Sequence, residues 1–292
     1  MKTMKYNWRY IFASSNKIAT IVFSIWGFFT LLIPTDKILN IIENEPLRIL
    51  AAALIFAIIY IIIILAVTIY SKRKRTLKVF NLHSNHSLYV EYGDLFNCGR
   101  SDERKNIVFA GNRCFDTIVD DDLVGSSKIH GIALNRIYEN GGRDQKSVNE
   151  EIQSNLSLHG YKTETLDQMD KRSGNLTRYE AGSVAEIKGL KNEQYFILGL
   201  TYFDKELRAR VEKSDYIKAI SSLIKYISDR SQGFPTYMPV IGTGGADVGT
   251  VNDLIVFIIK TIKMYKDEID CDIHIIVSEK EKKLGLLNLK MI

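Results

Sequence analysis

Two long stretches near the start of the chain contain no charged residue. Residues 18–34 (IATIVFSIWGFFTLLIP) and residues 49–70 (ILAAALIFAIIYIIIILAVTIY) are seventeen and twenty-two residues long. A helix that crosses a bilayer needs about 20 apolar residues, with about 17 as the lower limit. A signal peptide or a buried globular helix would be the alternative, but PTDKILNIIENEPLR, after the first stretch, offers no small-residue cleavage site. Residues 1–75 are therefore predicted to form a membrane hairpin with spans at about 18–34 and 49–70.

From about Leu77 onward the hydrophobic pattern changes to short strands that alternate with helices. Strand patterns at 88–94, 106–111, 194–203, 237–242 and 271–278 alternate with helical spacing at 127–142, 146–160, 213–230 and 250–266, and a last helix follows. Alternating strands and helices predict an α/β domain with a mixed, mainly parallel sheet that helices cover. Residues 161–190 are polar with weak periodicity, and we expect them to form an excursion near the site.

Charge is distributed unevenly along the chain. The net charge is +5 overall, and residues 1–75 hold ten Lys/Arg against three Asp/Glu, so residues 76–292 carry −2. A nucleic-acid partner is therefore not expected for the second part. The basic residues flank the two spans on their outer ends, and the connecting loop 35–48 carries only Lys37 and Arg48. The positive-inside rule then predicts cytoplasmic residues 1–17 and 71–292 and an outside loop at 35–48.

The residues that bind metals or form disulfides are sparse. Cys98, Cys114 and Cys271 lie far apart, without a CxxC pair, which favours buried or incidental thiols over a disulfide framework or a zinc site. His130 lies where a helix entry that binds a phosphate is expected, and we expect it to be a structural helix residue rather than a base. The acidic residues Asp116 and Asp120–Asp122 are expected to form a solvated loop rather than a metal site, although one carboxylate there could hold an amino group of a ligand.

Three short segments fall at the carboxyl ends of predicted strands, where ligands bind in such sheets. They are YGDLF (92–96), AGNRCFDT (110–117) leading into GSSKIHG (125–131), and IGTGGADVG (241–249). The last segment places Gly242, Gly244 and Gly245 between a strand and a helix. Glycines there let backbone N–H groups approach a phosphate, and the dipole of the 250–266 helix would favour the same anion.

These segments together resemble the macro domain, an ADP-ribose-binding fold, across roughly residues 76–290. The matching motifs are Gly93-Asp94-Leu95, Ala110-Gly111-Asn112 with the glycine-flanked 125–131, and Pro239-Val240-Ile241-Gly242-Thr243-Gly244-Gly245. By this resemblance Asp94 accepts a hydrogen bond from the adenine amino group and Asn112 contacts the distal ribose. Phe115 could pack on the ligand or in the core. The expected ligand-binding residues are Asp94, Leu95, Asn112, Phe115, Ser126, Ser127, Lys128, Ile241, Gly242, Thr243, Gly244, Gly245 and Ala246.

Two N-terminal spans followed by a macro-like domain are similar to the membrane effectors of type II Thoeris, a bacterial anti-phage system. The resemblance implies a location in the cell membrane and a signal made by a TIR-domain enzyme from NAD, which is histidine joined to ADP-ribose in this branch. It also implies that the effector forms homo-oligomers and disrupts the lipid bilayer. No resident cofactor is expected.

Two departures from hydrolytic macro domains bear on catalysis. Phe109 stands where those domains carry a second Asn, and GSSKIHG replaces the GGGVD loop with its water-positioning Asp. Both changes favour binding without catalysis. The alternatives are a membrane-anchored ADP-ribosyl hydrolase and a purely structural tether.

Overall fold

The computed structural model describes residues 2–32, 44–73, 75–206, 208–244 and 248–284. Within this range the chain divides into a helical unit up to Arg75 and a sheet-containing unit from Thr76 to Lys282.

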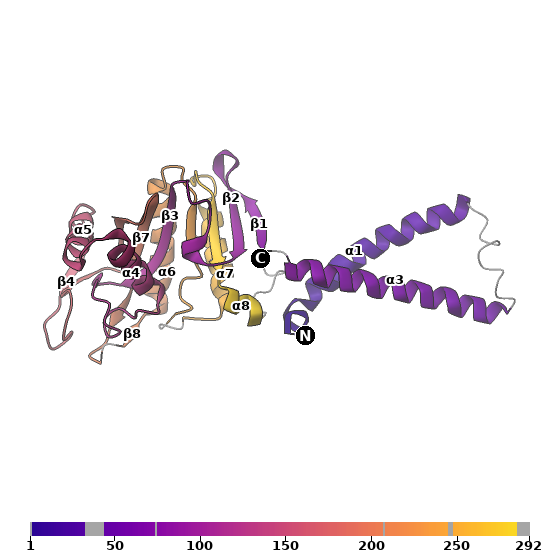
Figure 1. Cartoon of the computed structure of the whole chain (residues 1–292), viewed down its shortest axis with the longest axis horizontal. Coiled ribbons are helices and arrows are strands. Elements are labelled where there is room, and N and C mark those ends of the chain that lie inside the picture. Colours follow the sequence, from indigo (N-terminus) through magenta and orange to yellow (C-terminus); the bar gives the residue numbers. More distant parts are fainter. Residues whose placement is uncertain (1, 33–43, 74, 207, 245–247, 285–292) are drawn as a thin grey trace. The chain divides into compact units, whose positions relative to one another are not determined.

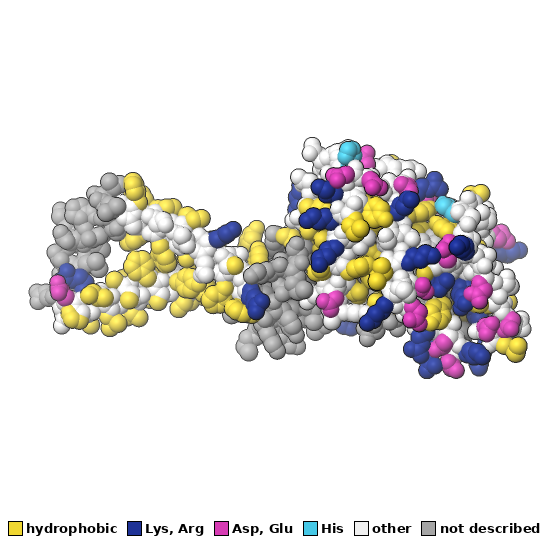
Figure 2. Space-filling model, turned by 180° about the vertical axis from the view of Figure 1, so that it is seen from behind, with side chains coloured by type: hydrophobic (Ala, Val, Ile, Leu, Met, Phe, Trp, Pro, Cys, Tyr) yellow, Lys and Arg dark blue, Asp and Glu magenta, His cyan; other side chains and the backbone are white. Residues whose placement is uncertain are grey.

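The helical unit consists of α1 (Lys2–Leu32) and α3 (Glu45–Arg73). Where the two helices contact each other they bury a small apolar cluster made by Ile11, Ala19, Ile63 and Val67. Outside that cluster, large apolar side chains remain exposed along both helices (Figure 2). Trp8–Phe29 and Glu45–Ser71 are long and apolar enough to cross a membrane. The first of these stretches begins ten residues earlier than the predicted span, and residues 33 and 34 lie outside the described residues.

The second unit is built around one eight-stranded mixed sheet with the order β1-β2-β10-β9-β3-β7-β6, and β8 pairs with β7 (Figure 1). Neighbours from β2 to β7 run parallel, whereas β1, β6 and β8 pair antiparallel with their neighbours. The prediction of a mixed, mainly parallel sheet is confirmed. The strands are β1 (Thr76–Asn81), β2 (Ser87–Tyr92), β3 (Lys105–Asn112), β6 (Val184–Lys188), β7 (Glu193–Phe203), β8 (Ala209–Arg210), β9 (Thr236–Pro239) and β10 (Ile273–Val277).

Helices cover this sheet, because each presents one apolar side at intervals of three and four residues. Helices α4 (Ile129–Asn135) and α5 (Gln145–Ser157) share a buried cluster with Ile107 and Phe109 of β3. Helix α6 (Lys213–Arg230) buries Ala219, Leu223 and Ile227 and contacts both β7 and α7 (Val251–Met264). A π-helical turn (Arg136–Asn140) extends α4, and α8 (Glu279–Leu284) ends the described chain.

Some of the β-strands were not predicted from the sequence. Residues 161–190 contain the small sheet of β4 (Thr163–Thr165) and β5 (Thr177–Tyr179), and then β6, whose Val184, Ala185 and Ile187 are buried against the main sheet. Strand β1 adds a further antiparallel edge. Strands of three to six residues are too short to show a clear period beside polar loops, so the expectation of a polar excursion was wrong for β6.

Candidate functional site

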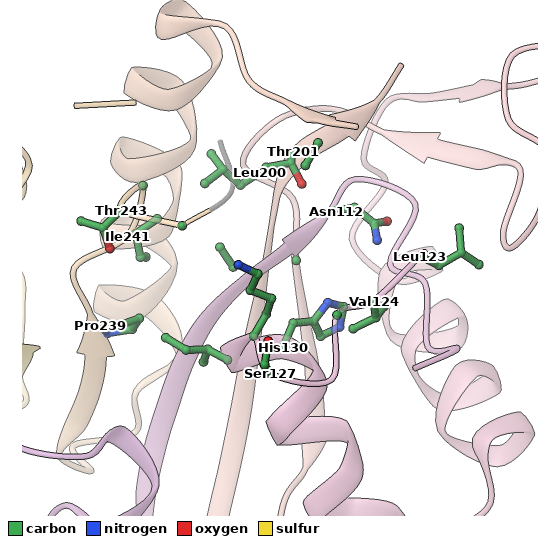
Figure 3. A pocket seen from close by; sticks show the side chains of 18 of the residues that line it. Asn112, Leu123, Val124, Ser127, His130, Leu200, Thr201, Pro239, Ile241 and Thr243 are labelled. Atoms are coloured by element: carbon green, nitrogen blue, oxygen red, sulfur yellow. The ribbon is translucent and has the colours of Figure 1, made fainter. Parts of the chain in front are cut away.

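A pocket of about 450 Å³ opens at the carboxyl ends of β3, β7 and β9 (Figure 3). Its size lies within the range of pockets that bind small molecules or cofactors. The lining comes from strand ends and the loops that follow them: Ala110–Asn112, Asp121–Gly125, Ser127–His130, Leu200, Thr201, Phe203, Ala209 and Pro239–Gly244. Among these described residues, Lys128 is the one lysine or arginine.

The loop after β9 forms one wall of the pocket and packs against Tyr216. The Tyr216 hydroxyl donates to the carbonyl oxygen of Ile241 at 2.9 Å, and Thr243 Oγ1 donates to the carbonyl oxygen of Val240 at 3.0 Å. Gly242 has a φ of +99°, and a Cβ there would lie 2.9 Å from the Tyr216 ring, so the fold itself requires glycine at this position. Gly244 lies in open space. The predicted site residues Gly245 and Ala246 lie outside the described residues.

The loop before α4 forms the opposite wall. The Lys128 N–H donates to the carbonyl oxygen of Gly125 at 3.0 Å, and a Cβ on Gly131 would overlap that same oxygen. Glycine at position 131 therefore lets the helix start pack tightly on the loop. No side chain in the described part of the chain caps the start of α4 at Lys128, so its first backbone N–H groups are left for other acceptors.

The helix that begins at the pocket is α4 rather than α7. Thr250 caps α7 by accepting from the N–H of Asp253, and no described residue of the α7 start lines the pocket. The expectation that the 250–266 helix directs its dipole at the ligand is therefore not supported, and the loop before α4 takes that place. Helix α5 is likewise capped by its own Asp144, which accepts from the N–H of Ser147.

His130, expected to be structural, lines the pocket beneath these two loops. Its side chain is buried, and its Nε2 atom has no hydrogen-bond partner among the described residues. Burial lowers the pKa of His130 to about 4, so the imidazole is neutral near pH 7. A Cβ on Gly111 would lie 3.1 Å from His130 Cε1, so the glycine of the 110–112 motif leaves room for the ring.

Asn112 sits at the end of β3 and is nearly fully buried. Its Oδ1 accepts from the backbone N–H groups of Cys114 at 3.0 Å and Asp116 at 3.3 Å, which holds the following loop in shape. No described residue accepts from its Nδ2, and Asn112 lines the pocket. This arrangement is compatible with the predicted contact to a ligand.

The residues just after Asn112 belong to the core instead of the pocket. Phe115 is buried, packs edge-to-face on Tyr179 at 5.6 Å between ring centroids, and does not line the pocket. Of the two roles left open for Phe115, the structure therefore supports the core role. Asp116 is also buried, and Lys171 Nζ lies 2.8 Å from its carboxylate. The expectation of a solvated loop was wrong for Asp116, because residue 171, far along the chain, supplies its partner.

Asp121 and Asp122, by contrast, are exposed and line the rim of the pocket. Asp121 Oδ1 accepts from the Ser126 N–H, and hydrogen bonding from Ser126 lowers the pKa of Asp121. The rim therefore carries negative charge at neutral pH. Among the described residues no group of three or more His, Cys, Asp or Glu could hold a metal ion.

Four predicted site residues do not line the pocket: Asp94, Leu95, Phe115 and Ser126. The Asp94 carboxylate accepts from the Phe96 N–H at 2.9 Å and from Asn97 Nδ2 at 3.2 Å, and Leu95 is buried. Ser126 uses its N–H on Asp121. The residues that the pocket does bring together are Asn112, Ser127, Lys128, Ile241, Gly242, Thr243 and Gly244.

Sequence reasoning placed His130 at the expected pyrophosphate-binding helix entry but gave it a structural role, and it missed the pocket residues Leu123, Val124, Leu200 and Thr201. Leu200 and Thr201 belong to β7, which lies next to β3, and the register between these strands shifts at Gly111 and Asn112. The apolar run at 194–203 is longer than those of the other strands. This length is the sequence signal that could have indicated that the end of β7 reaches the pocket. For His130 the signal is its place in the helix entry GSSKIHG, two residues after Lys128.

Comparisons with known proteins point to one family. The family model described as Thoeris protein ThsA, Macro domain, matches residues 88–278. Thoeris protein ThsA of Bacillus amyloliquefaciens (strain Y2) is 26% identical over 182 residues, covering 61% of this chain and 57% of that protein. The chain thus matches little more than half of that relative's length.

Solved structures of macrodomains are also similar. The Oceanobacillus iheyensis macrodomain with ADP gives a TM-score of 0.45 at 13% identity, covering 73% of this chain and 94% of the other. The macrodomain of Mycobacterium tuberculosis DarG gives 0.38 at 16% identity, covering 63% and 96%. The family match spans most of the sheet-containing unit, including both loops of the pocket. The chain belongs to the family of Thoeris ThsA macro domains.

Proposed function

We propose that the chain is a membrane effector of bacterial anti-phage defence whose macro domain binds an ADP-ribose-derived signal. The observation that carries the proposal is the pocket between two backbone loops, 125–128 and 241–244. Both loops bring glycine backbone to one cavity, where N–H groups can approach a pyrophosphate closely. The uncapped start of α4 and the Lys128 side chain add to the attraction for an anion.

The rest of the pocket suits the other parts of such a ligand. Asn112 Nδ2 can donate to a ribose hydroxyl, and the neutral His130 can exchange a hydrogen bond with another ligand group. The carboxylates of Asp121 and Asp122 at the rim can hold a positively charged amine. An amino-acid adduct of ADP-ribose has both an anionic centre and an amine, which supports histidine joined to ADP-ribose as the signal.

Binding without cleavage is the role we propose for this pocket. The predicted alternative, an anchored hydrolase, needs a group that positions a water molecule. Phe109 is buried in the core where hydrolytic macro domains place a second Asn. The carboxylate of Asp121 already accepts a hydrogen bond from its own loop. The source of the signal would be a TIR-domain enzyme that consumes NAD.

The two helices of the first unit support the membrane part of the proposal. Trp8–Phe29 and Glu45–Ser71 have the length and composition of membrane spans. We propose that they cross the cell membrane with the macro domain in the cytoplasm. A single hairpin of two helices encloses no polar lumen, so damage to the bilayer requires several copies. Ligand binding would shift the equilibrium toward that assembly, to the extent that the assembled form binds the ligand more tightly.

Calorimetry with the full-length protein in detergent tests the ligand assignment. ADP-ribose and its histidine adduct are titrated separately, with a Gly244→Val variant as the matched control. We expect the histidine adduct to bind the unchanged chain and both ligands to bind the variant much more weakly. Chromatography of the ligand afterwards should recover it intact. Equal binding to the variant would contradict the phosphate-loop assignment, and release of free ADP-ribose would support the hydrolase.

A further inference from the structure

The two membrane helices differ in character. Helix α3 is apolar on all sides between Ile49 and Tyr70. Helix α1 instead carries polar and small residues at intervals of three and four along one exposed side, which we name the polar stripe. The polar stripe consists of Arg9, Ala13, Asn16, Lys17, Thr20, Ser24 and Gly27.

The contacts between the helices fix their register. Tyr60 on α3 donates from its hydroxyl to Asn16 Oδ1 on α1 at 2.5 Å. Further along, the rings of Phe23 and Phe56 pack edge-to-face with 5.1 Å between centroids. The helices therefore run antiparallel with Asn16 level with Tyr60.

This register places a charge deep in the second span. Residues 59 and 60 are the middle pair of the uncharged stretch 49–70, so Tyr60 marks its centre. Lys17 directly follows Asn16 and is therefore near the bilayer midplane when α3 spans it, which differs from the prediction that residues 1–17 are cytoplasmic. The midplane is about 15 Å from either edge of the hydrocarbon layer, farther than a lysine side chain can reach.

Shifting the hairpin along the membrane normal does not remove the cost of placing the Lys17 charge in the hydrocarbon layer. If Lys17 moved to the interface, Tyr60 would move with it, and the run from Ile61 to Ile69 would leave the hydrocarbon. That run holds seven large aliphatic side chains, whose burial outweighs the penalty of one ammonium group. Within the described residues no acidic side chain forms an ion pair with Lys17.

From this register we propose that several copies of the hairpin assemble with their polar stripes facing one another around a water-filled path, while α3 faces the lipid. Lysines from several copies repel each other at close range, so the ring of Lys17 needs water and anions between its members. A ring of ammonium groups favours anions in the path. This inference rests on the proposal that the hairpin spans the membrane.

Cysteine labelling in inside-out membrane vesicles that contain the full-length protein tests this assignment. Thr20→Cys lies on the polar stripe, and Ile18→Cys, two residues earlier, lies on the opposite side of α1, outside the polar stripe. Each is treated with an anionic and a cationic methanethiosulfonate reagent, before and after adding the histidine adduct of ADP-ribose. The three native cysteines are buried, so the background is low.

We expect Thr20→Cys to react and Ile18→Cys to remain unlabelled. The anionic reagent should react faster at Thr20→Cys, on the order of tenfold. Lys17→Gln should remove this preference, and Lys17→Arg should keep it.

Labelling of Asn40→Cys from outside intact cells checks the membrane hairpin separately. If Asn40→Cys is labelled but Thr20→Cys and Ile18→Cys behave alike under both conditions, the inference is overturned while the hairpin stands. A charge preference that survives Lys17→Gln also overturns it. If Asn40→Cys is not labelled, the membrane part of the proposed function fails together with the inference.

Discussion

Lys171 Nζ lies 2.8 Å from the carboxylate of Asp116, and both side chains are almost completely buried. The same ammonium group donates to the carbonyl oxygen of Asn175 at 2.7 Å, while the Asn175 N–H donates to Asp116 Oδ1 at 2.7 Å. Asn175 Nδ2 also donates to the carbonyl oxygens of Cys114 and Phe115. The segment 171–175 thus fixes the conformation of the loop after Asn112.

Lys171→Met should destabilise the fold strongly. It removes one partner of a buried ion pair and leaves Asp116 charged without compensation, which costs about 3–5 kcal/mol. Chemical denaturation of the full-length protein in detergent, followed by circular dichroism, measures this. Lys146→Met is the control, because the pair of Lys146 with Glu150 is exposed and should change stability by less than about 1 kcal/mol. Equal effects of the two substitutions would contradict the structural role of Lys171.

Substitution of Gly242 should lower the stability of the fold, whereas substitution of Gly244 should weaken ligand binding only. Gly242→Ala forces a side chain into a φ of +99° and within 2.9 Å of the Tyr216 ring, so we expect a loss of stability of about 1–3 kcal/mol. Gly244→Val meets open space and should leave the melting temperature unchanged. It should nevertheless weaken binding of ADP-ribose, because a branched side chain would occupy the approach of the pyrophosphate. Thermal unfolding and calorimetry on both variants separate the two effects.

Stability should fall as the pH is lowered from about 6.5 to about 4. A histidine in the unfolded chain has a pKa near 6.5, whereas burial lowers the pKa of His130 to about 4 in the folded chain. In that window the unfolded state binds a proton that the folded state rejects, so His130 contributes stability above pH 6.5 that is lost as the pH falls. The loss reaches up to about 3 kcal/mol by pH 4.

His130→Phe is the matched variant for this pH dependence, since it keeps a ring without a titrating group. Denaturation at several pH values should show a shallower acid loss for the variant than for the unchanged chain. The same variant should bind ADP-ribose more weakly, because phenylalanine cannot form a hydrogen bond to the ligand. An unchanged pH slope would show that His130 is accessible to protons in the folded protein.

Asp94→Ala should weaken binding of the signal by about 1.5–3 kcal/mol, if Asp94 accepts from the adenine as the family resemblance implies. The structure shows that this carboxylate also organises its own turn through the Phe96 N–H. Asp94→Asn is therefore the informative partner, because an amide oxygen can still accept from that N–H. A loss of binding in the Ala variant that the Asn variant fully restores would show that an acceptor oxygen is sufficient at this position and that the negative charge of Asp94 adds nothing to binding.

Local patterns in the sequence determined much of the architecture. The two uncharged stretches and the alternation of strands with helices are short-range features, and their described residues form helices and strands. The first candidate span nevertheless begins ten residues before the predicted one, and Gly242 and Gly244 line the pocket. A parallel sheet gathers the ends of its strands at one edge, so sequence order alone was enough to bring Asn112, Lys128 and Thr243 to one pocket.

Tertiary structure decided what depends on partners far apart in the chain. Asp116 became a core residue because Lys171 reaches it, and Phe115 because Tyr179 and Gly199 pack on it. His130 is a pocket residue because Gly111, on another element, leaves space for its ring. The position of Lys17 opposite the middle of α3 follows from contacts between the two helices, the hydrogen bond of Tyr60 to Asn16 and the packing of Phe23 on Phe56. Burial and register are properties of pairs of segments, and a single segment's pattern carries no information about its partner.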